Sequence, residues 1–185
     1  MQDQIGDIER ELMLIGRHQV IAALRTDRPT GRLERSAYTL LSRIEAEGPM
    51  SIGQLAEAFG LDTSTINRQT GAMLRNGLVE RIPDPDGGIA RKLRITGDGL
   101  RRLHADRDWS VNGLSVVLAD WPAEEVAVLA RALARFNMSI EQHEGRSWPR
   151  PADGPADAPA GGPLDDPLDG PTGGPAGDAG DRAQA

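Results

Sequence analysis

The sequence has no cysteine and no long apolar run, and each absence removes a class of function. Without cysteine the chain can form no disulfide, no thiol redox sensor and no zinc site with cysteine ligands. No stretch approaches the ~20 apolar residues that span a bilayer, and the N-terminus lacks the basic and apolar regions of a signal peptide. We therefore expect a cytoplasmic protein with no membrane partner.

Motifs that carry catalytic chemistry are equally scarce. The three histidines, His18, His104 and His143, are far apart in the sequence and fall on different expected helices, which is not the pattern of a metal site. Glu124 and Glu125 are typical of the first turn of a helix rather than of an acid–base pair. No P-loop motif for phosphate binding is present. The sequence thus predicts neither an enzyme nor a bound metal or cofactor.

The C-terminal segment from Ser147 onward consists mainly of proline, glycine, alanine and aspartate. Such a composition buries too little apolar surface to offset the entropy lost when the backbone is ordered. We expect residues 147–185 to form a disordered acidic tail that takes no part in packing.

Charge is distributed unevenly along this acidic chain, whose net charge is −7. The tail has two arginines and seven aspartates, whereas residues 63–104 have eight basic and four acidic residues, a local net charge of +4. A basic patch of this kind is suited to nucleic-acid phosphates. The same charges could also form an ordinary solvated face, so charge alone does not decide between the two.

Both ends of the remaining body show apolar residues at helical spacing. The stripes comprise Ile5, Ile8 and Leu12 in an N-terminal helix that extends towards Asp27, and Val126, Leu129, Leu133, Phe136 and Ile140 in the last helix. We interpret residues 1–32 and 100–146 as dimerisation helices, because an apolar stripe must be covered and a two-fold contact with a second copy does this economically. The alternative is that the stripes pack on each other within one chain.

Residues 51–99 show the order helix, turn, helix and two short strands, and one more helix precedes them in a DNA-binding domain over residues 33–99. The predicted elements are a helix over Leu33–Glu47, a capping box at Ser51 and Gln54, a helix from Asp62 or Thr63 to Asn76–Gly77, strands over Leu78–Ile82 and Lys92–Thr96, and a helix capped by Thr96. Proline, aspartate and glycine between the strands indicate a loop. The pattern predicts a winged helix-turn-helix, a mainly α fold with a small β-wing.

The second helix of such a module enters the major groove of duplex DNA. With Ile66, Thr70 and Met73 turned inward, the outward set is Thr63, Ser64, Thr65, Asn67, Arg68 and Gln69. All of these side chains can form hydrogen bonds and none is acidic. We expect Arg68 above all to contact a base or a phosphate, while the shorter residues could instead only cap the helix or face solvent.

Three short segments, Ser64–Arg68, Gly77–Arg81 and Leu93–Thr96 followed by Gly99, resemble the DNA-binding core of the multiple antibiotic resistance regulator (MarR) family. The likeness covers about Ile5 to Gly145. It implies a homodimeric transcriptional regulator, which we expect to be a repressor, that binds a pseudo-palindromic operator in double-stranded DNA. It also implies that a small-molecule effector releases the DNA.

The wing departs from the pattern of that family. The family commonly has Asp-x-Arg at the tip of the wing, where the arginine enters the minor groove, but the matching positions here are Gly87 and Ile89. We therefore expect weaker or more phosphate-driven binding by the wing, through Arg91, Lys92 or Arg94, and we expect the specificity to rest on the second helix. The alternative function is a protein-interaction module that reuses the winged helix without sequence-specific DNA binding.

Overall fold

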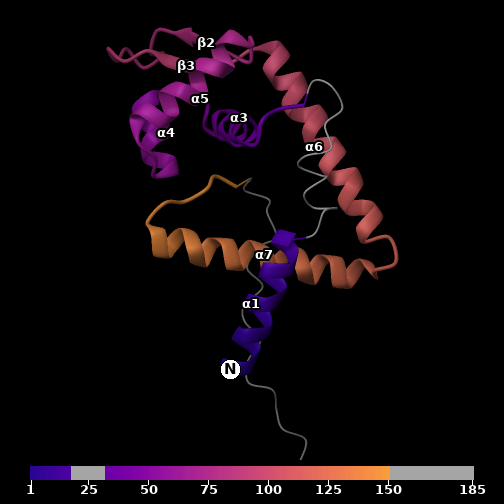
Figure 1. Ribbon diagram of the computed structural model, residues 1–185. Coiled ribbons are helices and arrows are strands. Elements are labelled where there is room, and N and C mark those ends of the chain that lie inside the picture. Colours follow the sequence, from indigo (N-terminus) through magenta and orange to yellow (C-terminus); the bar gives the residue numbers. More distant parts are fainter. Residues whose placement is uncertain (18–31, 151–185) are drawn as a thin grey trace, which may run out of the picture. The chain divides into compact units, whose positions relative to one another are not determined.

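The computed structural model describes residues 1–17 and 32–150. In chain order the elements are α1 (Gln2–Arg17), α3 (Arg35–Glu47), β1 (Met50–Ser51), α4 (Ile52–Phe59), α5 (Thr63–Arg75), β2 (Val79–Ile82), β3 (Lys92–Ile95), α6 (Gly97–Val117) and α7 (Ala123–Glu144) (Figure 1). The predicted fold class, mainly α with a small sheet, is confirmed. The expected continuation of the first helix towards Asp27 and the histidine at position 18 lie outside the described residues.

The sheet has three strands, one more than the sequence predicted. β3 is the central strand and pairs antiparallel with β2 on one side and with β1 on the other, in the register Met50 to Leu93 and Arg81 to Leu93. β1 has only two residues, too few for the period-two alternation that identifies a strand in a sequence. Because β1 leads directly into α4, this short pairing attaches the helix-turn-helix to the wing.

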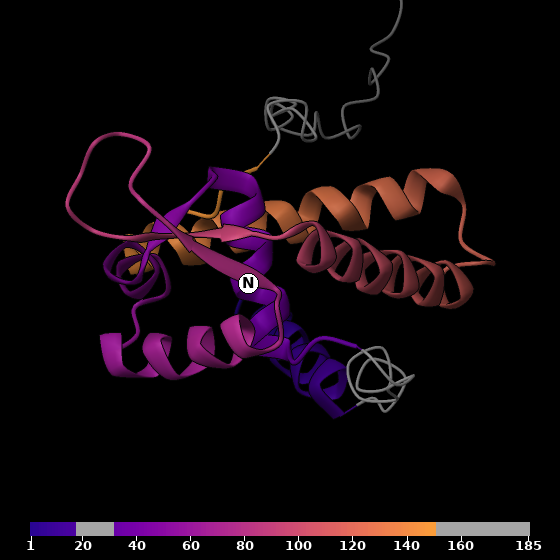
Figure 2. The same cartoon turned by 90° about the horizontal axis from the view of Figure 1, so that it is seen from above.

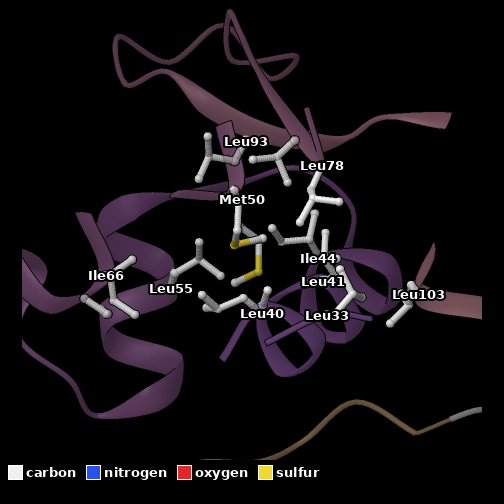
Figure 3. Packing of buried hydrophobic residues seen from close by; sticks show 14 residues of the cluster. Leu33, Leu40, Leu41, Ile44, Met50, Leu55, Ile66, Leu78, Leu93 and Leu103 are labelled. Carbon is white, nitrogen blue, oxygen red and sulfur yellow. The ribbon is translucent and has the colours of Figure 1, made fainter. Parts of the chain in front are cut away.

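The hydrophobic core is formed where α3, α4, α5, the sheet and the start of α6 meet (Figure 3). Leu41, Leu55 and Ile66 come from the three helices, and Leu93 comes from the central strand; each is at most 2% exposed. Leu103 of α6 is also fully buried. The core therefore extends beyond Gly99, where the sequence placed the end of the DNA-binding domain.

Local capping interactions set the starts of α4 and α6 as predicted. At the start of α4, the Ser51 hydroxyl accepts from the backbone N–H of Gln54 at 3.2 Å and the Gln54 side chain accepts from the Ser51 N–H at 2.8 Å, which is a complete capping box. At the start of α6, the Thr96 hydroxyl accepts from the Gly99 N–H and donates to the Gly77 carbonyl at 2.6 Å. The second contact joins the turn after α5 to the end of the wing.

The apolar stripes of α1 and α7 are largely uncovered in the described part of one chain. On α1, Ile5, Ile8 and Leu12 are 45–58% exposed, and α7 has no buried residue. On α7, Leu133, Phe136 and Ile140 are exposed, while Val126 and Leu129 are half-buried. Packing among residues 1–17 and 32–150 therefore leaves most of both stripes exposed.

The expectation that nothing packs from Ser147 onward is wrong for the first residues of that segment. The Arg43 guanidinium donates to the Ser147 carbonyl at 2.7 Å, and the Trp148 ring packs edge-on against Phe59. Arg150 forms a 2.6 Å ion pair with Glu141. The physical reason is that one large aromatic side chain gains apolar contact area that the average composition of a segment does not reveal.

Candidate nucleic-acid interface

Helix α5 has one face in the core and the opposite face in solvent. Ile66, Thr70 and Met73 are at most 1% exposed, and the Thr70 hydroxyl donates to the Ile66 carbonyl at 2.7 Å, so this polar residue is satisfied in the core. The predicted contact residues lie on the other side: Thr63, Ser64, Asn67 and Arg68 are exposed, and Thr65 and Gln69 are half-buried. The structure thus brings the six predicted residues together over the first two turns of one helix.

The N-terminus of α5 is suited to an anion. Asp62 is the N-cap residue but makes no side-chain capping bond, and the first turn contains no acidic residue. The Thr65 N–H donates to the Asp62 carbonyl at 2.9 Å. The backbone N–H groups and hydroxyls of Thr63 and Ser64, together with the partial positive charge of the helix dipole, therefore suit a phosphate oxygen. Arg68 lies one turn further along and has no ion-pair partner among the described residues.

The wing is the loop between β2 and β3, which extends beyond the helices (Figure 2). The three cations predicted to contact phosphates differ in their surroundings. Arg91 is exposed and has no ion-pair partner in the described part of the chain. Arg94 is exposed but pairs with Glu80 of β2 at 2.8 Å. Of these three cations, Arg91 alone has no carboxylate partner among the residues that the structure describes.

Lys92 is buried, with 8% of its surface exposed. Its Nζ lies 2.8 Å from Oδ1 of Asp84 and 2.8 Å from Oδ2 of Asp86. The hydrogen bond from Lys92 lowers the pKa of the Asp84 carboxyl, and the hydrogen bond to Asp84 raises the pKa of Lys92. Asp84 and Lys92 are consequently both charged at neutral pH. Because its ammonium group is fully engaged inside the loop, we leave Lys92 out of the proposed phosphate contacts.

A polar junction that the sequence did not predict joins α3 to α6. Glu45 of α3 accepts from Arg107 at 2.6 Å and contacts Nε2 of His104 at 2.5 Å. The hydrogen bond from Arg107 lowers the pKa of Glu45 more than any other contact. The buried Asp106 accepts from the backbone N–H of Leu33 at 3.0 Å. In the sequence, His104 and Arg107 show only a spacing that places them on one face of a helix. Their shared partner Glu45 is distant in the sequence, so the junction could not be predicted.

Comparison with known proteins agrees with this geometry. The model of the MarR family matches residues 33–87, which contain the helix-turn-helix and the first half of the wing. YxaD of Bacillus subtilis, described as an uncharacterized HTH-type transcriptional regulator, is 34% identical over 139 residues, which are 75% of this chain and 96% of YxaD. The chain belongs to the MarR family.

Solved structures show the same fold. A MarR family protein from Bacillus stearothermophilus matches with a TM-score of 0.64 and 22% identity, covering 76% of this chain and 97% of that chain. The PcaV transcriptional regulator from Streptomyces coelicolor matches with a TM-score of 0.52 and 26% identity, covering 74% of this chain and 93% of that chain. That structure was solved in complex with the natural ligand of PcaV. This member of the MarR family is thus a transcriptional regulator with a winged-helix DNA-binding lobe.

No helix within 1–17 and 32–150 is both long and apolar enough to cross a bilayer. The same ranges contain no cluster of three or more side chains of the kinds that ligate metals.

Proposed function

We propose that the protein is a homodimeric repressor that inserts α5 of each protomer into successive major-groove segments of a pseudo-palindromic operator. The observation that carries the proposal is the solvent face of α5, which has hydrogen-bonding side chains and a free arginine but no acid. Arg68 suits a guanine edge, because a guanidinium can donate to O6 and N7 together, and Asn67 or Gln69 suits adenine. The hydroxyls of Thr63 and Ser64 suit phosphate oxygens. Arg91 of the wing adds a phosphate contact.

The dimer is supported by the two uncovered stripes. Large apolar side chains gathered along a helix face are stable in water only when another surface covers them, and a second copy of the same helices would do so symmetrically. The contact residues in this proposal are Ile5, Ile8, Leu12, Val126, Leu129, Leu133, Phe136 and Ile140. Two winged-helix lobes related by a two-fold axis would contact two half-sites about one helical turn apart.

Release by a small-molecule effector is the third part of the proposal. It is supported by the likeness to PcaV, which was solved with a natural ligand. In this chain a cavity of about 440 Å³ lies among residues of α3, α4 and the end of α7, with Arg43, Phe59 and Trp148 in its lining. That volume lies within the range of small-molecule binding sites. We assign the protein no catalytic activity and a cytoplasmic location.

The proposal is tested by a gel-shift titration of the full-length protein with the DNA upstream of its own gene. We expect retardation that survives unlabelled competitor DNA at moderate salt, and a log–log salt slope of about −0.9 for each phosphate contact. A matched pair of variants tests α5 directly. Arg68→Lys retains the charge but loses the two-pronged hydrogen bond, so we expect it to relax the base preference while preserving the salt slope. Arg68→Ala should reduce both the base preference and the salt slope.

The alternative, a protein-interaction module without sequence-specific DNA binding, predicts a different result. In that case no retardation would survive competitor DNA at moderate salt, and Arg68→Lys would bind like the wild type on every duplex. Either result contradicts the repressor proposal.

A further inference from the structure

The wing loop is folded around one carboxylate. Asp84 accepts from the backbone N–H of Asp86 through Oδ1 at 3.0 Å, and its own carbonyl accepts from the Gly87 N–H at 3.0 Å. Gly87 has a φ of +80°, which favours glycine, and a Cβ on Gly88 would collide with the Asp84 carboxylate. These contacts define one turn rather than an open loop.

Lys92 fixes this turn to the sheet. It lies in the central strand, paired with Ser51 of β1 on one side and Ile82 of β2 on the other, so its backbone position is set by two ladders. From there its ammonium group contacts both loop carboxylates at 2.8 Å. Two uncompensated aspartates in a loop that approaches DNA would repel phosphates. The Lys92 ammonium group neutralises both carboxylates, and the same two ion pairs fix the direction of the loop.

The tip that the turn presents is apolar. Residues 87–90 are Gly, Gly, Ile and Ala, which carry no charge and no side-chain hydrogen-bonding group. Ile89 is 105% exposed, the highest exposure of any large hydrophobic residue in the described part of the chain. Apolar side chains of this kind contact the minor groove in many DNA-binding proteins, where they act through the shape and deformability of the duplex.

We propose that Lys92 is a positioning residue for DNA binding, which neutralises Asp84 and Asp86 and fixes the wing so that Ile89 makes an apolar contact in the minor groove. This inference rests on the proposed function, since it concerns the same interface. Ile89 has no donor for the minor-groove acceptors of the bases, so its contribution depends on groove shape rather than on hydrogen-bonded base recognition.

The contact of Ile89 is tested with a duplex selected from a randomised library by the full-length wild-type protein. Ile89→Ala should weaken binding about tenfold, as expected for removing a buried aliphatic contact, and should leave the salt slope unchanged because no charge is lost. Ile89→Met, which is also large and apolar, should bind nearly as well as the wild type. The matched control is Arg91→Ala, for which we expect the slope to fall by roughly 0.9. Thermal unfolding of all three variants should match the wild type, because both side chains are exposed.

The role of Lys92 is tested by charge rescue. Lys92→Met should weaken binding and flatten the salt dependence, because two carboxylates are left facing the phosphates. Adding Asp84→Asn and Asp86→Asn should restore the salt slope, which could not happen if Lys92 itself contacted a phosphate. In the Lys92→Met background, Ile89→Ala should reduce the DNA affinity by much less than the tenfold expected in the wild type, because the wing tip is no longer fixed.

Three results would overturn the inference while leaving the proposed function intact. These are wild-type affinity for Ile89→Ala, failure of the asparagine variants to restore the slope, or an unchanged tenfold effect of Ile89→Ala in the Lys92→Met background. If the wild-type protein itself selects no duplex from the library, the proposed function is contradicted and the inference with it.

Discussion

The rings of Trp148 and Phe59 pack edge to face, with their centroids 5.9 Å apart and their planes at 71°. The Arg43 guanidinium lies over the same indole, 5.3 Å from its centroid, and donates to the neighbouring Ser147 carbonyl. The segment that follows α7 is thereby attached to α3 and α4 of the DNA-binding lobe. Residues 147–150 are therefore part of the folded body.

The first prediction concerns where the chain can be truncated. A chain ending at Arg150 should unfold at the wild-type temperature, whereas one ending at Arg146 should lose about 1–2 kcal/mol and several degrees in Tm. The loss reflects the aromatic contact of Trp148 and the bonds to Arg43 and Glu141. Trp148→Ala in the full chain should reproduce most of it in a calorimetric scan. Equal melting temperatures for the two truncated chains would show that the contact adds nothing to stability.

The second prediction concerns a close backbone approach at the start of α6. A Cβ on Gly99 would collide with the backbone carbonyl of Leu78, so Gly99→Ala should destabilise the lobe by about 1–3 kcal/mol. Gly97→Ala is the matched control, because a Cβ there meets only the end of Arg101 at 3.6 Å. Helix propensity predicts that this control is neutral or slightly stabilising. Urea unfolding of the two variants measures the difference, and similar midpoints would contradict the close packing.

The third prediction concerns pH. The contacts with Arg107 lower the pKa of Glu45 in the folded state, so the unfolded chain takes up a proton first as the pH falls. The stability from this carboxylate is present above its ordinary pKa of 4.5 and is lost as the pH falls through the lower folded value. Glu45→Gln should be less stable than the wild type at pH 7, and the difference in their free energies of unfolding should decrease below about pH 4.5.

Urea unfolding at several pH values, from neutral to acidic, measures this difference in the free energy of unfolding. Glu80→Gln is a suitable control, because Glu80 forms an exposed ion pair with Arg94 and should contribute little to the free energy of unfolding. A gap between wild type and Glu45→Gln that stays constant with pH would contradict the role assigned to the α3–α6 junction.

The fourth prediction concerns the dimer. Leu133→Glu on α7 places a charge in the proposed interface, so sedimentation should show a shift from dimer to monomer at micromolar concentration. Arg131→Glu, on an exposed and already charged position of the same helix, is the control and should remain dimeric. Wild-type protein that sediments as a monomer would contradict the proposed interface.

Features that depend on short-range patterns could be predicted from the sequence. The capping box at Ser51, the inward face of α5 and the cap at Thr96 involve residues within a few positions of each other, so spacing and residue type identify them. The same holds for the six candidate residues on the outer face of α5.

Features that depend on distant partners could not be predicted. Lys92 is charged and was expected on the surface, but its burial follows from the course of the wing loop, which brings Asp84 and Asp86 to its ammonium group. Glu45 and Arg107 are 62 positions apart, and Arg43 is 104 positions from Ser147. No periodicity connects such pairs, because only the tertiary fold brings them together.

The most direct test of the account is hydroxyl-radical footprinting of the full-length wild-type protein and Arg68→Ala on the duplex selected from the randomised library. We predict two protected half-sites related by a dyad, about one helical turn apart, and we expect Arg68→Ala to lose protection at matching positions in both half-sites. A single asymmetric footprint, or protection that Arg68→Ala leaves unchanged, would contradict a symmetric regulator that contacts DNA through α5.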